Sequence, residues 1–234
     1  MLLTFIKHYP FILAFLLGLI PALIWLWFWL KEDSHPEPAK MITLSFLGGM
    51  ASVAVVLPLQ ELVYNNFQNY FTLSFILWAA IEEICKFAFA YFIALQWKSI
   101  TDEPTDDIIY LIISALGFVT MENTLFLLAP LKAGNILESI INDNLRFIGA
   151  SLLHIVSSGT VGLFLALSFY KNLASKRIYL VIGIILAIAL HTTFNLLIID
   201  DTTGNIFLTF GLVWLGIITL LLMFEKVKRE KPQT

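Results

Sequence analysis

The sequence is poor in charge and in cysteine. Only 13% of its 234 residues are Asp, Glu, Lys or Arg, whereas 59% are hydrophobic and the mean hydropathy is +0.87. A soluble domain of this size needs more polar surface, so the composition predicts a polytopic membrane protein. The single cysteine, Cys85, excludes an internal disulfide and any metal site built from several cysteines. The sequence also lacks an extended basic patch with interleaved aromatic residues, which argues against nucleic-acid binding.

Long apolar stretches are abundant. A helix needs about 20 apolar residues to cross a bilayer, and charged or turn-rich segments separate the stretches that are long enough. We predict an all-α fold, a transmembrane bundle of about seven helices that forms a single membrane-embedded domain over residues 1–234. The amphipathic segment QELVYNNFQNY is expected to lie along the membrane interface. The predicted spans are Phe11–Leu30, Met41–Pro58, Phe71–Leu95, Ile108–Leu131, Leu145–Tyr170, Ile178–Ile199 and Ile206–Phe224.

The basic residues of the loops fall unequally on the two sides of such a bundle. Alternating the loops across seven spans places ten on one side and three, Lys7, Lys132 and Arg146, on the other. Because cytoplasmic loops are enriched in Lys and Arg, we expect the C-terminus to be cytoplasmic, with residues 225–234 as a tail. The expected location is the cell membrane. The ten are Lys31, Lys40, Lys98, Lys171, Lys176, Arg177, Lys226, Lys228, Arg229 and Lys231.

Ionisable residues occur inside four consecutive predicted spans. Each carboxylate or lysine at mid-bilayer costs about 2.5–3.5 kcal/mol on insertion scales, so intramembrane charge is read as functional by default. Each such residue also has a purely structural interpretation, as an ion pair or a hydrogen bond between helices. The residues are Glu82, Glu83 and Lys86 in the third span, Glu122 and Asn123 in the fourth, His154 in the fifth, and His191 and Asn195 in the sixth.

The spacing of these residues indicates one shared site. Glu82 and Glu83 both lie within one helical turn of Lys86, so that the lysine can reach either carboxylate. In the fifth and sixth spans the histidines lie on rows of small or polar residues at every fourth position, which favour close helix packing toward the bundle interior. Counting from the span ends at about 1.5 Å per residue places all the acids and histidines at similar depth.

Such a cluster can activate water in two ways, and both remain open at this stage. Three glutamates, one lysine and two neutral histidines sum to a charge of −2. A divalent metal such as zinc could cancel it, with Glu83, Glu122, His154 and His191 as candidate ligands. Alternatively, one or two glutamates stay protonated and Glu82 or Glu83 acts as general base, while the histidines donate hydrogen bonds and Asn195 stabilises the oxyanion. We slightly prefer the mechanism that requires no cofactor.

Four motifs carry a resemblance to a known family. EEICK (82–86), GFVTMEN (117–123), the isolated His154 and HTTFN (191–195) resemble the EExxK, FxxxEN, His and HxxxN motifs of the PrsW intramembrane proteases. The CAAX protease and CPBP superfamily is similar at greater distance, but Lys86 and Glu122 favour the PrsW branch. The matched region, about 71–200, would form the catalytic core.

The resemblance implies an intramembrane endopeptidase of glutamic or metal-dependent type. It implies a membrane-anchored protein substrate, of the anti-sigma factor type, cut first on its extracytoplasmic side. The residues it marks as catalytic are Glu82, Glu83, Glu122, His154, His191 and Asn195, with Lys86, Asn123 and Phe118 in support. Two alternatives are a proton- or cation-coupled transporter, against which no inverted repeat is seen, and a non-catalytic membrane scaffold.

Overall fold

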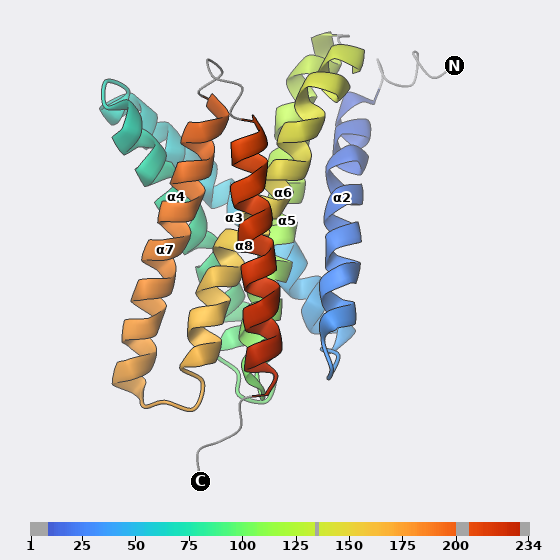
Figure 1. The fold of residues 1–234 in the computed structure, drawn as a ribbon. Helices are drawn as coiled ribbons and strands as arrows, with labels where there is room; N and C mark the ends of the chain where they lie inside the picture. The colour runs from blue at the N-terminus through green and yellow to red at the C-terminus, as the bar shows by residue number, and fades with distance from the viewer. Residues whose placement is uncertain (1–8, 134–135, 200–205, 230–234) are drawn as a thin grey trace.

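The computed structural model describes residues 9–133, 136–199 and 206–229, with the backbone alone for 136–148, 199 and 206. Seven helices and one π-helical turn make up this part of the chain, and it contains no strand, which confirms the predicted all-α bundle (Figure 1). The elements are α2 (Pro10–Glu32), α3 (Ala39–Phe67), α4 (Phe71–Ala90), η1 (Tyr91–Leu95), α5 (Pro104–Ala133), α6 (Ile136–Leu167), α7 (Leu173–Ile199) and α8 (Ile206–Val227).

Successive helices alternate in direction, so that α2 begins at the upper end of Figure 1 and α8 ends at the lower end. Six of them have the length and apolarity of membrane spans. The exception is α4, whose 20 residues include Glu82, Glu83 and Lys86. A 20-residue helix is still long enough to cross the hydrocarbon core. The seven predicted crossings therefore correspond to seven helices, and α4 departs from the others because of its charges.

Several boundaries differ from those predicted. The longest differences are at the end of α3, which continues through Pro58 to Phe67 as one helix of 29 residues, and at the start of α6, which begins at Ile136 and not at Leu145. The segment QELVYNNFQNY is therefore mostly the C-terminal end of α3 rather than a separate interfacial segment. At the other end of the chain, α8 extends to Val227, so the helix includes the first residues assigned to the tail. The residues 230–234, and the side chains of Lys7 and Arg146, lie outside the described part.

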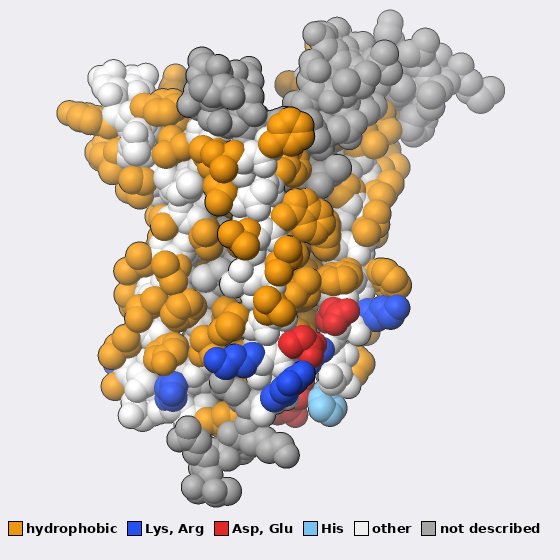
Figure 2. All heavy atoms as spheres, in the orientation of Figure 1, with side chains coloured by type: hydrophobic (Ala, Val, Ile, Leu, Met, Phe, Trp, Pro, Cys, Tyr) orange, Lys and Arg blue, Asp and Glu red, His pale blue; other side chains and the backbone are white. Residues whose placement is uncertain are grey.

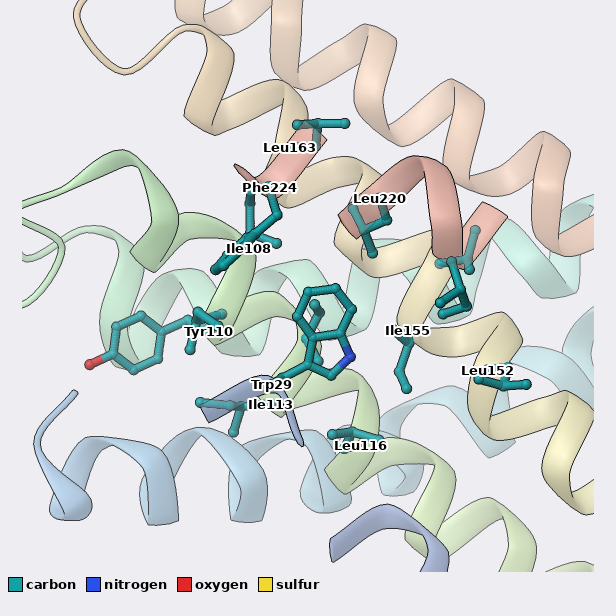
Figure 3. Close-up of a cluster of buried hydrophobic side chains, with 14 of the residues drawn as sticks. Trp29, Ile108, Tyr110, Ile113, Leu116, Leu152, Ile155, Leu163, Leu220 and Phe224 are labelled. Atoms are coloured by element: carbon teal, nitrogen blue, oxygen red, sulfur yellow. The ribbon is translucent and has the colours of Figure 1, made fainter. Parts of the chain in front are cut away.

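Helix α5 is the centre of the bundle. About 72% of its most apolar stretch is buried, against 17% for α2, and α2, α3, α4 and α6 all pack on it. The carboxylate of Asp106 accepts hydrogen bonds from the backbone N–H groups of Asp102 and Glu103, at 2.8 and 2.9 Å. These bonds hold the backbone in place where α5 begins. The main hydrophobic cluster joins α2, α5, α6 and α8 around Trp29 (Figure 3).

Two glycines allow α3 and α5 to approach backbone to backbone. A Cβ at Gly49 would lie 1.9 Å from the carbonyl oxygen of Ser114, and a Cβ at Gly117 would lie 2.0 Å from that of Phe46. Neither contact could be relieved by a flexible side chain, because the opposing atoms are backbone. Close approach through small residues is typical of helices packed in lipid, and here it brings α3 against the helix that carries Glu122.

The outer surface is what a bilayer requires. Hydrophobic side chains cover most of the length of the helices, whereas Lys, Arg, Asp and Glu gather toward the lower end in the face shown (Figure 2). Exposed apolar side chains of α7 and α8 contribute to this surface, including Ile185 (59%) and Leu215 (61%). Such a surface would be insoluble in water but matches hydrocarbon. The protein is therefore a multi-pass membrane protein.

Candidate active site

Four helices bring the predicted polar residues together in the bundle interior. The helix α4 carries Glu82 and Glu83, which are 4% and 1% exposed, and α6 and α7 each contribute a histidine that is 2% exposed. The two imidazole rings, of His154 and His191, lie perpendicular with centroids 5.0 Å apart. The expectation of one shared cluster is thereby confirmed in its geometry.

Glu83 is the centre of the cluster and has hydrogen-bond partners on both oxygens. Its Oε1 accepts from Lys86 Nζ at 2.6 Å and lies 2.7 Å from Nδ1 of His191. Its Oε2 accepts from the hydroxyl of Ser158 at 2.9 Å. Three donors from three helices therefore hold this carboxylate, and charge-assisted bonds of this length are the strong ones. Both oxygens of Glu83 are therefore occupied by donors of the protein, and neither is available to an incoming molecule.

Lys86 is fully buried and its ammonium group has three neighbours. Besides Glu83, its Nζ lies 2.9 Å from Nδ1 of His154 and 5.1 Å from the centroid of the Phe118 ring. The aromatic face stabilises the cation on the side where no carboxylate is available. The backbone carbonyl of Lys86 accepts from the hydroxyl of Ser114 at 3.1 Å, which ties α4 to α5. Lys86 and Phe118, for which supporting roles were predicted, therefore lie beside Glu83 and His154.

The contacts of His154 define its tautomer. An ammonium group is a donor only, so Nδ1 of His154 must accept from Lys86 and cannot carry a proton. In a neutral imidazole the proton is then on Nε2, which lies 2.9 Å from Oε2 of Glu122 and donates to it. Glu122 is the most exposed acid of the cluster, with 24% of its side chain accessible. A chain of hydrogen bonds thus runs from Glu83 through Lys86 and His154 to Glu122.

His191 and Glu82 face each other through Nε2 and Oε2. Because Nδ1 of His191 donates to the Glu83 carboxylate, its Nε2 carries a lone pair. This nitrogen lies 3.5 Å from Oε2 of Glu82, an oxygen that has no hydrogen-bond donor among the described residues. A proton or a cation shared by the two atoms suits this separation, whereas a water molecule fits beside them in the cavity and not between them. Glu82 is therefore the carboxylate with an available oxygen.

A cavity of about 660 Å³ adjoins this available oxygen. Glu82, Glu122 and both histidines line it, whereas Glu83 and Lys86 do not. Asn123 and Asn195 also line it, and the side-chain nitrogen of Asn123 has no partner among the described residues. The remaining walls are mostly apolar or aromatic and include Val56, Tyr64, Phe75, Trp78, Phe118 and Phe126. Tyr64 and Phe126 are more than half exposed, so the cavity reaches the surface at their end of the bundle.

One group of side chains in the described part of the chain has the composition of a zinc site. One ligand atom each from Glu82, His154 and His191 lies within 4.8 Å of the other two. Two histidines and one glutamate are a known ligand set of catalytic zinc. The unpartnered oxygen of Glu82 and the lone pair of His191 fit such an ion. The set differs from the predicted ligands in that Glu82 replaces Glu83 and Glu122.

Comparison with known proteins agrees with the geometry. The family model described as PrsW family intramembrane metalloprotease matches residues 37–223. The chain belongs to the PrsW family of intramembrane proteases. The match starts well before the four motifs and therefore includes α3 and most of α8, so the PrsW family pattern extends beyond the predicted core of 71–200.

Individual relatives support the PrsW assignment. The chain is 30% identical to Protease PrsW of Clostridioides difficile over 197 residues, which cover 80% of this chain and 79% of the relative. It is 26% identical to Protease PrsW of Oceanobacillus iheyensis over 220 residues, 93% of this chain and 95% of the relative. No solved structure matches the chain.

Two residues of this PrsW site were not predicted from the sequence. Ser158 lies one turn after His154 on the same face of α6, and that i+4 spacing could have suggested its contact with Glu83. Gln60 lies on α3, outside all four motifs, and its amide contacts Glu82. The only signal for Gln60 in the sequence is an uncharged polar residue two positions after Pro58. Its partner is 22 residues away, so local spacing could not have identified the contact.

Proposed function

We propose that this protein hydrolyses a peptide bond of a membrane-bound protein, with Glu82 as the general base that activates water. The observation that carries the proposal is the unpartnered Oε2 of Glu82, buried and next to Nε2 of His191 at the wall of a cavity. A carboxylate oxygen held without a donor has its hydrogen-bonding capacity reserved for an incoming group. PrsW membership supports hydrolysis over the transporter and scaffold alternatives.

The reaction can be written with the residues of this chain. A water molecule in the cavity beside Oε2 of Glu82 gives a proton to Glu82 as its oxygen attacks the scissile carbonyl carbon. The resulting oxyanion is stabilised by donors at the cavity wall, of which the side-chain amide of Asn195 is one candidate. Glu82 then returns its proton to the amide nitrogen as the C–N bond breaks. The products are a carboxylic acid and an amine, so that atoms and protons balance.

Glu83 and Lys86 have a different role in this mechanism. They fix the charge and the orientation of the two histidines, since Glu83 binds Nδ1 of His191 and Lys86 binds Nδ1 of His154. Each histidine therefore presents Nε2 toward the cavity side of the cluster. A carboxylate that orients a histidine through its remote nitrogen is a recurrent device in hydrolytic sites.

Zinc is an alternative occupant of the same residues: bound through Oε2 it would make Glu82 a ligand instead of the general base, and Nε2 of His154 would have to give up the proton that it donates to Glu122. When bound to Glu82, His154 and His191, it would supply the positive charge that acidifies a water molecule. The fit is supported by the donor set and by the unpartnered oxygen of Glu82.

The finer relation of this chain to the CAAX protease and CPBP superfamily rests on the EExxK-type and HxxxN motifs.

We further propose that the substrate is cut on its extracytoplasmic side, as an anti-sigma factor type regulator would be. The distribution of Lys and Arg favours a cytoplasmic C-terminus, at the lower end of Figure 1. The cavity reaches the surface near Tyr64 and Phe126. Tyr64 lies in the last turns of α3, at the opposite end of that helix from its cytoplasmic start at Ala39. A soluble segment of the substrate could therefore enter from outside.

Capture of the substrate tests this proposal. Cells that produce the wild-type chain or the Glu82→Gln variant are compared by labelling the new N-termini of membrane proteins. We expect at least one single-span protein to be truncated on its extracytoplasmic side by the wild type and to accumulate intact, bound to the variant. Identical N-terminal profiles in the two cell populations would contradict the proposal. Glu225→Gln, at the cytoplasmic end of α8, serves as a matched control and should behave as wild type.

A further inference from the structure

Helix α3 contributes a polar side chain to the cavity that holds the cluster. Gln60 is half-buried, and its Nε2 donates to Oε1 of Glu82 at 2.8 Å. A carboxylate accepts only, so the nitrogen of the amide and not its oxygen must face an ionised Glu82. Gln60 is thus the donor that occupies one oxygen of Glu82 and leaves the other, Oε2, available.

The backbone of Gln60 is fixed as well. The indole Nε1 of Trp78 donates to the carbonyl oxygen of Gln60 at 3.1 Å. Trp78 lies one helical turn before Glu82 on α4, so both ends of Gln60 are bonded to the same face of that helix. The Trp78 ring is itself packed edge-on against Phe75, with centroids 5.2 Å apart. Gln60, Trp78 and Glu82 therefore form a brace between α3 and α4.

The brace restricts a side chain that is otherwise mobile. A glutamate has three side-chain torsions, and holding it in one arrangement costs rotamer entropy. Glu83 is fixed by three donors, but Gln60 is the donor that the described residues offer to Glu82. With Oε1 bound to Gln60, the carboxylate is turned so that Oε2 lies 3.5 Å from Nε2 of His191. The reactive geometry of Glu82 thus depends on a residue of α3.

We propose that Gln60 is a positioning residue that orients Glu82 toward the scissile bond and is itself held by Trp78. This inference rests on the proposed function, because it assigns Gln60 a role through the general base. A purely structural alternative is an amide that ties two helices. The two roles differ in what they affect: orientation of a reacting group changes kcat, whereas helix tying changes stability or substrate binding.

Kinetic constants test the positioning role. The probe is the single-span protein captured by the Glu82→Gln variant, reconstituted in liposomes with the purified full-length enzyme. In Gln60→Met, which keeps the length of the side chain but has no donor, we expect kcat to fall about 10- to 100-fold with KM changed less than about threefold. Trp78→Phe keeps an aromatic ring without the N–H and should lower kcat in the same direction by a smaller factor. The matched control is Gln96→Met, because Gln96 is exposed and donates to the backbone of its own turn.

A double-mutant cycle tests the contact without any substrate. The apparent Tm is measured for Gln60→Met, for Glu82→Met and for the double variant. We expect the shifts to be non-additive by about 2 °C or more, because the two side chains share one hydrogen bond. The same cycle with Gln96→Met in place of Gln60→Met should be additive. Additive shifts at Gln60 would overturn the proposed contact.

The outcomes separate this inference from the proposed function. If Glu82→Gln still cleaves, the general-base assignment fails. If Glu82→Gln is inactive but Gln60→Met has the kcat of the wild type, or if its KM alone rises, the positioning role of Gln60 is wrong and the general base stands. If Gln60→Met does not fold, Trp78→Phe decides, since a wild-type kcat in that variant would contradict the brace.

Discussion

Two adjacent glutamates with different surroundings should respond oppositely to the same substitution. Glu83 accepts from Lys86, His191 and Ser158 at 2.6–2.9 Å and is not exposed to the cavity. Glu82 accepts from one amide and has a buried oxygen with no donor. Replacing either by glutamine keeps the volume and removes one negative charge. We expect Glu83→Gln to destabilise the fold, and Glu82→Gln to leave it intact while removing activity.

The expected loss of stability in each variant depends on whether the substitution leaves a buried cation without a carboxylate. Glu83→Gln leaves Lys86, which is fully buried, without its carboxylate, and breaking a buried ion pair in this way costs about 3–5 kcal/mol. For a chain of this length each kcal/mol lowers Tm by about 2–4 °C, so the expected fall is about 6–20 °C. In Glu82→Gln no cation loses its partner, and Tm should stay within about 3 °C of the wild type.

Thermal unfolding of the purified variants in one detergent, followed by tryptophan fluorescence, measures this difference. Cleavage of the captured substrate is measured on the same samples at a temperature below both transitions. An equal loss of stability in the two variants would refute the separation of roles. So would a Glu83→Gln variant as stable as the wild type, because Lys86 would then have another counter-charge.

Three further predictions concern packing, pH and metal. Gly117→Ala places a Cβ 2.0 Å from a backbone oxygen of α3 and should lower the free energy of unfolding by about 1–3 kcal/mol. Gly211→Ala is the control, because a Cβ there has nothing within 4 Å and should leave the free energy of unfolding unchanged. Chemical denaturation measures both variants. Burial raises the pKa of Glu37, so the folded state binds a proton at higher pH than the unfolded state and gains stability as pH falls through the folded pKa. Glu37→Gln should therefore weaken the rise in Tm as pH is lowered toward the ordinary pKa of a glutamate, and an unchanged pH profile would contradict this. Elemental analysis of chelator-treated protein after addition of zinc tests the alternative ligand set: any ion retained by the wild type should be lost in His191→Ala, and equal zinc in both would exclude Glu82, His154 and His191 as its ligands.

Much of the fold was accessible from the sequence because lipid imposes simple rules. Apolar length and polar breaks predicted seven helices, and the small-residue rows of α6 and α7 predicted which faces turn inward. Gly162 confirms the row on α6, since a Cβ there would lie 2.6 Å from the Cα of Ile108 on α5. The end of α3 was missed because the apolar run gives way after Pro58 to the amphipathic segment QELVYNNFQNY, which was expected to lie along the interface. In the structure the helix continues through Pro58 to Phe67.

The residues that make up the site could be predicted from the sequence, but the separate roles of Glu82 and Glu83 could not. Charge in an apolar run identified Glu82, Glu83 and Lys86, and spacing brought the histidines to the same depth. Which glutamate is available depends on donors from other helices. Ser158 on α6 and Gln60 on α3 reach their carboxylates across sequence separations of 75 and 22 residues. Such contacts follow from helix packing and rotation, which periodicity in a single sequence does not specify.

The most direct test of the account is hydrolysis by the Glu82→Gln variant of the purified protein in liposomes. The account predicts that the wild type cleaves the captured single-span protein at one bond. It predicts that the variant, with a Tm within about 3 °C of the wild type, produces no detectable fragment. Cleavage by the folded variant at a rate comparable to the wild type would contradict the assignment of Glu82 as the general base.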